Sequence, residues 1–418
     1  MTDSATRSTP ISANPPVVKI DRRAISLLAL GHLSDDINQS FLPALLPLLV
    51  LERHLTYQAA ATLVLAQAIS SSVVQPAIGF IADKYPMPWI AGLGLLLAGF
   101  GIAGIGFMPS YALIFVCALI SGLGVAMFHP EAARFANLAA GTRKASGMRW
   151  FAVGGNLGFA IGPIFATVAL ATYGITGTFL AAIPVAVMSA LLLRETSRLR
   201  TFLPQVSKAK NATPLPDDWS GFLRLTAFIM VRSTLYIGLV SFIPLYFVGV
   251  VHTSPWIGNM VLTTFLLTGI AGTLTGGSLA DTYGRRIVIN VSMLAALVCV
   301  LLFTETTNAA NTTSVVAGFV FAIALGIAIG GSQSATIVLG QEYLPNRLGV
   351  ASGVTLGLGV SIGGMFTPVL GTIADHYGLH AAMLSIGALT AVALILGLLM
   401  PDPVKRRTLL IGRRAAVT

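Results

Sequence analysis

Four polar residues follow one another at helical spacing inside an apolar run near the start of the chain: His32, Asp35, Asp36 and Gln39. Residues three and four positions apart share one face of a helix, so most of these side chains should point the same way. Counted from residue 24, Asp35 lies roughly 16 Å along such a helix, near the midplane of a membrane about 30 Å thick. A carboxylate at that depth is costly unless it is protonated, paired or hydrated. We therefore expect this set to load and release a proton; the alternative is a static pair that ties helices together.

A second candidate proton group is the segment 128–131, which contains His129, Pro130 and Glu131. Histidine titrates in the physiological pH range, and a proline inside a helix frees a backbone carbonyl for local hydrogen bonding. We expect His129 and Glu131 to serve as a proton exit or gate. The alternative is a helix end at which Glu131 pairs with Arg134 or Arg149.

Arg232 is the basic residue that lies deep inside an apolar run. A guanidinium remains charged and binds carboxylate or phosphate through two parallel hydrogen bonds. Arg232 is therefore a candidate anchor for an anionic substrate or a counter-ion of Asp35 or Asp36. We expect it to be traded between substrate and aspartate; the alternative is a fixed structural pair. The other residues expected to line the substrate cavity are Gln39, Tyr236, Ser332 and Gln333.

The composition predicts that these groups are held by membrane-spanning helices. The chain of 418 residues is 55% hydrophobic and only 10% charged, which is far outside the range of a soluble domain. A helix needs roughly 20 apolar residues to cross a bilayer. Twelve stretches meet this requirement: 24–51, 57–82, 89–107, 111–137, 147–172, 175–193, 222–250, 256–280, 287–305, 313–341, 349–374 and 380–400.

The charge distribution predicts the topology of these twelve helices. The formal net charge is +10, and all 25 basic residues except Arg53 and Arg232 fall in the two tails, in alternate loops or in the central linker. By the positive-inside rule, both termini are then cytoplasmic. The basic residues report topology and contact with anionic lipid headgroups, so we expect a lipid bilayer and a small molecule as partners and no nucleic acid.

The chain also shows an internal duplication. Gly79 and Asp83 in the first half have the same spacing as Gly277 and Asp281 in the second, and both pairs follow a long apolar run. We expect two pseudo-symmetric six-helix bundles, with a substrate site between them near the midplane. The predicted boundaries are a tail at 1–23, a bundle at 24–194, a linker at 195–221, a bundle at 222–400 and a tail at 401–418.

The twelve spans, the linker and the motif at 277–286 together resemble the major facilitator superfamily. Four shorter segments, at 83–89, 128–131, 153–156 and 341–345, resemble its fosmidomycin-resistance branch of inner-membrane drug exporters. The resemblance implies that the N-terminal Gly79-to-Asp83 motif latches the two bundles in one conformation. This copy lacks the Gly-Arg-Arg end of its C-terminal counterpart. The residues assigned to this conformational gate are Gly79, Asp83, Lys84, Arg134, Arg143, Gly277, Asp281, Arg285 and Arg286. A charged loop that only sets topology is the alternative.

The fifth span contains glycines at intervals of four, Gly154, Gly158 and Gly162, followed by Pro163. Such glycines form a groove that another helix can approach closely, and the Gly-Pro step bends the helix. The pattern resembles the antiporter motif of drug exporters in the superfamily and favours export, although Ala166 replaces a further glycine. Ordinary close packing is the alternative.

We expect a proton-coupled secondary transporter that exports small toxic compounds, such as fosmidomycin-like phosphonates or other anionic or amphiphilic drugs, by alternating access. Proton-symport uptake of an organic anion would use the same charges, and a receptor or membrane-embedded enzyme is a further alternative. The sequence contains no phosphate-binding glycine-rich loop with Lys-Ser/Thr and no zinc motif of His and Glu residues. We therefore expect no enzyme activity, no metal and no cofactor other than the proton, in a monomer of the bacterial inner membrane.

Overall fold

The computed structural model describes residues 20–85, 87–141, 143–202, 216–345, 347, 351, 354–355 and 359–401. These residues form helices and connections, with no β-strand among them. The first half contains α1 (Arg22–Arg53), α2 (Tyr57–Lys84), α3 (Trp89–Ile105), α4 (Tyr111–Ala139), α5 (Lys144–Tyr173), the 3-10 helix η1 (Gly174–Ala181), α6 (Ala182–Arg194) and α7 (Thr196–Arg200). The second half contains α8 (Trp219–Gly249), α9 (Pro255–Tyr283), α10 (Arg285–Thr306), α11 (Thr312–Tyr343) and α13 (Gly359–Leu398).

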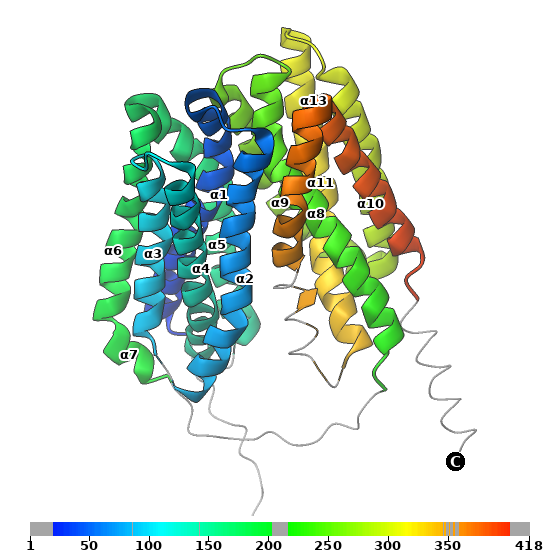
Figure 1. Cartoon of the computed structure of the whole chain (residues 1–418). Coiled ribbons are helices and arrows are strands. Elements are labelled where there is room, and N and C mark those ends of the chain that lie inside the picture. The colour runs from blue at the N-terminus through cyan, green and yellow to red at the C-terminus, as the bar shows by residue number, and fades with distance from the viewer. Residues whose placement is uncertain are drawn as a thin grey trace, which may run out of the picture.

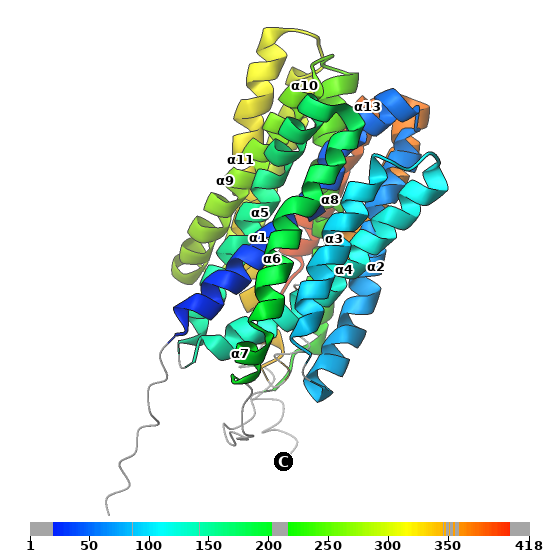
Figure 2. The same ribbon diagram turned by 90° about the vertical axis from the view of Figure 1, so that its left-hand side faces the viewer.

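The helices of each half form a bundle, and the two bundles stand side by side (Figure 1). A view turned by 90° shows that the long helices of both bundles run in roughly the same direction (Figure 2). The starts of α1 and α8, the short helix α7 and the end of α13 all lie at one end of the molecule, the lower end in Figure 1. Each bundle therefore begins and ends on the same side, as a positive-inside topology requires.

Eight of the described segments are long and apolar enough to cross a membrane. The helix α3 is shorter, and α1 is interrupted by the polar residues from His32 to Gln39. The all-helical, multi-pass membrane architecture predicted from composition is therefore confirmed. The number of twelve crossings and the cytoplasmic location of both termini stay predictions.

Two glycines mark the same bend in both halves. Gly174 ends α5 with a φ of 60°, and Gly378 interrupts α13 with a φ of 86°. Both values lie in the left-handed region that glycine adopts without the cost of a Cβ atom. The predicted spans ending near 374 and starting at 380 are the two arms of α13, and the predicted start at 349 lies outside the described residues.

A second repeated feature caps the first helix of each half. The Asp21 side chain caps the N-terminus of α1, and its backbone N–H donates to the Ala139 carbonyl at 2.9 Å. In the same way, Asp218 caps α8, and its N–H donates to the Tyr343 carbonyl at 2.7 Å. Each cap satisfies N–H groups that a helix start leaves free, so both halves fix their first helix to the end of their fourth.

The predicted linker 195–221 differs from the structure at both ends. The helix α7 occupies residues Thr196–Arg200, and α8 begins at Trp219, before the predicted start at 222. The polar Arg198 on α7 pairs with Asp21 at 2.6 Å. Because the sequence boundaries were placed by hydropathy, they miss polar helical turns such as α7 and the first turn of α8.

The halves contact each other through α5 and α13. The helix α5 packs on α1 in its own half and on α9 across the interface, and α13 packs on α8 and across on α2. A Cβ atom at Gly371 of α13 would lie 2.6 Å from the Cα of Gln58 on α2. The two backbones are therefore in direct contact at this point, which is possible because the residue is glycine.

Candidate functional site

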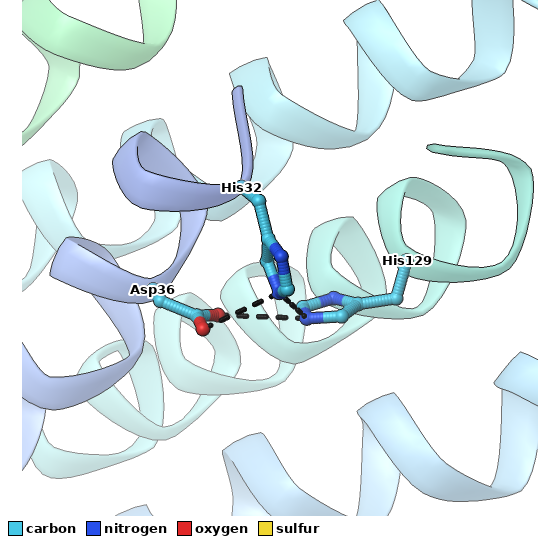
Figure 3. A group of neighbouring side chains, drawn as sticks. All are labelled: His32, Asp36 and His129. Carbon is cyan, nitrogen blue, oxygen red and sulfur yellow. Dashed lines mark hydrogen bonds and ion pairs between the residues drawn. The ribbon is translucent and has the colours of Figure 1, made fainter. Parts of the chain in front are cut away.

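Three side chains from two helices form a compact cluster (Figure 3). His32 and Asp36 lie one turn apart on α1, and their Nε2 and Oδ2 atoms are 3.4 Å apart. His129 on α4 places its Nε2 3.5 Å from Asp36 Oδ1 and 3.2 Å from His32 Nε2. The structure thus brings together the two separate sets of candidate proton groups, on α1 and α4.

The orientation of both imidazole rings is set by partners on the far side of each ring. His32 Nδ1 lies 2.9 Å from the carbonyl oxygen of Phe151 on α5, and the two rings stack with centroids 4.2 Å apart. His129 Nδ1 lies 3.2 Å from the Val125 carbonyl. When Nδ1 of a neutral ring donates to its carbonyl, the Nε2 atom of that ring faces the cluster as an acceptor.

Asp35 is the most deeply buried acid of the site. Its side chain has no solvent exposure, and Oδ2 lies 3.3 Å from His129 Nδ1. Neither carboxylate oxygen has a hydrogen-bond partner among the described residues. An ionised carboxylate without donors is unstable in such surroundings, so Asp35 depends on a proton of its own or on a charged His129.

The glycines of α5 create the space for this cluster. A Cβ atom at Gly155 would overlap the His32 ring and lie 2.7 Å from Asp36 Oδ2. Cβ atoms at Gly154 and Gly158 would overlap the α1 backbone at the carbonyls of the residues 29 and 33. Gly162 faces the Ser40 side chain of α1 in the same way. The helix that approaches the predicted glycine groove is therefore α1, and Pro163 lies inside α5 beyond the groove.

Arg232 lies on α8 in the second half and is buried, with 8% exposure. Its Nε donates to Ser332 Oγ at 2.7 Å, and its second terminal nitrogen donates to the Ile329 carbonyl at 2.9 Å. Both partners belong to α11. Among the described residues, no ion pair joins Arg232 to Asp35 or Asp36, so in this conformation the arginine is held by its own half.

Arg232 and His32 occupy matching positions in the two halves. Gly158 of α5 lies against the carbonyl of Leu33, and the equivalent Gly363 of α13 lies against the carbonyl of Ser233. His32 and Arg232 each precede these contact residues directly. At equivalent positions, the first half therefore carries a titratable histidine and the second half carries a permanently charged arginine.

Gln39 and Tyr236 each lie on the same helix as one of the two charged groups. Gln39 donates to Asp36 Oδ1 at 3.2 Å. Tyr236 lies one turn beyond Arg232 on α8, and its ring packs against that of Phe265 with centroids 5.9 Å apart. A role for its hydroxyl in a substrate cavity stays a prediction. Gln333 is half-buried on α11.

A small cavity of about 40 Å³ lies between the halves beside these residues. Its walls include Gln39, Gln67, Phe159 and Ile237, from α1, α2, α5 and α8. This volume holds water rather than a drug-sized molecule, which needs a site of roughly 300 Å³ or more. This cavity by itself therefore does not hold a drug-sized substrate.

Glu131 lies apart from the cluster. Its side chain has no solvent exposure, accepts a hydrogen bond from the Met87 backbone N–H at 3.1 Å and pairs with Arg134 at 3.6 Å. These contacts hold the connection between α2 and α3 against α4. Of the two interpretations made from the sequence, the arrangement favours the helix-end pair over a proton exit through Glu131.

The N-terminal gate residues Gly79, Asp83 and Lys84 fall on a part of α2 whose side chains lie outside the described residues. Arg143 is exposed at the start of α5. Arg134 contacts Glu131, as described above. The proposed latch between Asp83 and either arginine therefore stays a prediction.

The C-terminal gate residues form a network within their own half. Arg285 pairs with Asp281 at 3.4 Å and with Glu342 of α11 at 3.0 Å. Arg286 donates to the Leu398 carbonyl at the end of α13. Gly277 faces Ser334 of α11, where an added Cβ would lie 3.3 Å from the hydroxyl. This copy of the motif joins α9, α10, α11 and α13.

Three contributors to the site escaped sequence analysis. Phe151 stacks on His32 but looks in the sequence like any apolar helix residue. Gly155 lies outside the series of glycines at intervals of four, although it borders the cluster directly. Ser332 was expected to line the cavity, but its hydrogen bond with Arg232 joins residues 100 positions apart and has no local signal in the sequence.

The chain matches the model of the Major Facilitator Superfamily over residues 28–356 and 252–417. It is 32% identical to the uncharacterized MFS-type transporter YfnC of Bacillus subtilis (strain 168) over 91% of this chain and 93% of that protein. It is also 32% identical to the fosmidomycin resistance protein of Escherichia coli (strain K12) over 84% of this chain and 86% of that protein. The resemblance stated from the motifs is confirmed.

Solved structures show the same fold. A bacterial homolog of the human lysosomal transporter Spinster, in an inward-facing and unoccupied conformation, superposes with a TM-score of 0.74 at 14% identity and covers 92% of this chain and 98% of its own. The nucleoside transporter NupG gives a TM-score of 0.69 at 15% identity, with 91% and 99% covered. The family and the fold are those of membrane transporters and indicate no catalytic family. The chain is a member of the major facilitator superfamily.

Proposed function

We propose that this transporter couples the export of small anionic or amphiphilic toxic compounds, with fosmidomycin-like phosphonates as the first candidates, to the inward movement of protons. The observation that supports this function is that the buried acids and the buried cation belong to different halves. The buried acids Asp35 and Asp36 face histidines in the first half, whereas the buried cation Arg232 belongs to the second. The proton groups and the candidate anion group therefore belong to different halves, which move relative to each other in alternating access.

In this mechanism, Arg232 holds the anionic group of the substrate while the site is open to the cytoplasm. Ser332 and the Ile329 carbonyl occupy two of its donors, and the remaining guanidinium donors are available to an anion. A proton that enters from outside neutralises an aspartate on α1. This proton binds after the substrate has left, and it allows the empty site to return to the cytoplasmic side, where its release restores the charge of the aspartate before the next substrate binds.

Export is favoured over uptake by two observations. One relative with 32% identity is a fosmidomycin resistance protein, and α5 packs through Gly154, Gly158 and Gly162 directly on the helix that carries the acids. Uptake of an organic anion with protons is the second candidate because the same charges would serve it. We place the protein as a monomer in the bacterial inner membrane, with the basic helix α7 on the cytoplasmic side.

A drug-sensitivity panel that includes fosmidomycin tests the direction. A drug-sensitive bacterial host should become more resistant when it expresses the wild type, and Asp35→Asn should abolish this protection at equal protein levels. Glu305→Gln, which changes an acid that is 62% exposed, is the matched control and should protect like wild type. Increased sensitivity on expression would instead favour uptake, and no effect with any compound would contradict the proposed export.

A further inference from the structure

We propose that His32, Asp36 and His129 form a binding site for a divalent transition-metal ion of the zinc class. The sequence alone does not predict this site, because the two histidines lie on different helices and are 97 residues apart in the chain. In the folded protein, these three side chains each direct one ligand atom to a common point, within 4.8 Å of one another.

The separations match the edges of a zinc coordination polyhedron. Zinc binds imidazole nitrogen and carboxylate oxygen at about 2.0–2.2 Å with tetrahedral angles, so neighbouring ligand atoms lie about 3.3–3.5 Å apart. The observed separations are 3.2 Å between the two Nε2 atoms and 3.4 and 3.5 Å from these nitrogens to the Asp36 oxygens. The 3.4 and 3.5 Å separations involve different oxygens of Asp36, so the carboxylate would bind the ion through both oxygens or rotate to bring one oxygen to both nitrogens, which already lie within 4.8 Å of it as a set.

The surroundings of the two rings are those of metal ligands. A ligating histidine usually donates its second ring N–H to a carbonyl or a carboxylate, which fixes the tautomer and the ring plane. His32 Nδ1 has the Phe151 carbonyl at 2.9 Å. His129 Nδ1 has both the Val125 carbonyl at 3.2 Å and Asp35 Oδ2 at 3.3 Å. Both Nε2 lone pairs are thereby directed at the same point.

The site is accessible to an ion and leaves room for an exchangeable ligand. The side chains of His32, Asp36 and His129 are 12%, 13% and 22% exposed, respectively. Gln39, which donates to Asp36, also lines the cavity between the halves. Three protein ligands with an open fourth position are typical of sites that bind water or a substrate group. Two imidazoles favour Zn²⁺, Ni²⁺ or Cu²⁺ over the oxygen-seeking Mg²⁺ and Ca²⁺.

The test is a calorimetric titration of the purified, chelator-stripped full chain in detergent with Zn²⁺. We expect one ion per chain, and His32→Gln or His129→Gln should weaken the affinity by about 100-fold or more. His376→Gln, on an exposed position of α13, should bind like wild type. Mg²⁺ should give no measurable heat at the same concentrations.

His129→Cys separates ligation from a structural role, because a thiolate is itself a zinc ligand. This variant should bind Zn²⁺ where His129→Gln does not. Zinc binding that is unchanged by both glutamine substitutions, or no binding to wild type, would overturn the site. Zinc binding is independent of the proposed function. Inhibition of transport by Zn²⁺ rests on the proposed function, because the ion would occupy the atoms that accept protons. Binding without inhibition would therefore count against the proton pathway and leave the metal site standing.

Discussion

The carboxylate of Asp375, on α13, accepts a hydrogen bond from the backbone N–H of Tyr57, the first residue of α2, at 2.8 Å. Its second oxygen accepts from the N–H of Gln58 at 2.9 Å. The free N–H groups and the dipole at a helix start favour such a negative charge. Because α2 and α13 belong to different halves, this contact holds the bundles together at the end opposite α7 (Figure 1).

Asp375→Ala should open this end more often. Loss of about 1–2 kcal/mol would change the population of the open state by roughly 5- to 30-fold. The reporter is Ala68→Cys, beside the interface residue Gly364, in a protein whose two native cysteines are replaced by serine. The measurement is the rate at which a membrane-impermeant maleimide added outside labels this cysteine. Asp375→Glu keeps the charge, so its Ala68→Cys form should be labelled more slowly than that of Asp375→Ala. Equal labelling rates in the wild-type background, Asp375→Ala and Asp375→Glu would contradict a role of Asp375 in holding the bundles together.

Gly158→Ala should disable the transporter. The new Cβ would overlap the Leu33 carbonyl, and a backbone atom cannot rotate away, so we expect a loss of about 1–3 kcal/mol or more of stability. Thermal unfolding in detergent and drug resistance should both fall. Gly269→Ala is the matched control, since its Cβ would meet its nearest atom at 3.7 Å. If both variants behave alike, the close contact between α5 and α1 is not required.

Arg232→Lys should weaken substrate binding although it keeps the charge. An ammonium lacks the planar fork that can hold Ser332 and an anion together. We expect KM to rise about tenfold or more in a transport assay, a difference of about 1.4 kcal/mol. Ser332→Ala should raise KM less, because it removes only the hydrogen bond that positions the guanidinium. An unchanged KM in Arg232→Lys would argue against direct anion binding.

Asp21→Asn should destabilise the protein at neutral pH and not in acid. Burial alone would raise the pKa of Asp21, but the Ala24 N–H and the Arg198 guanidinium outweigh it and hold the pKa below its usual range. A depressed pKa stabilises the fold at pH values above the unfolded pKa, about 4, and this contribution is lost as the pH falls through the folded value. The difference in thermal unfolding temperature from wild type should be clear at pH 7 and should shrink steadily as the pH falls below about 4.

The parts of this structure that follow from local sequence patterns were predictable. Hydropathy indicates the helices, the repeated Tyr-Gly pairs mark equivalent bends at Gly174 and Gly378, and the glycines of α5 predict a closely packed neighbour. The identity of that neighbour is not a local property. Helical spacing placed His32 and Asp36 on one face but gave no information about which helix stands opposite.

The site itself depends on contacts between distant residues. The His32 and His129 rings are 97 residues apart in sequence, and Arg232 and Ser332 are 100 apart. An ion pair between Arg232 and the acids of α1 was a reasonable hypothesis, because a buried cation needs partners. In this conformation a hydroxyl and a backbone carbonyl serve instead, and a single sequence carries no signal that separates these solutions.

Proton coupling through α1 is tested most directly in proteoliposomes that enclose a pH-sensitive dye. The substrate is the compound against which the protein confers the highest resistance. Substrate added under an imposed pH gradient should produce a proton flux with the wild type and with Glu305→Gln, and none with Asp35→Asn. Substrate transport by the wild type without any substrate-dependent proton flux, or an undiminished flux with Asp35→Asn, would contradict the account.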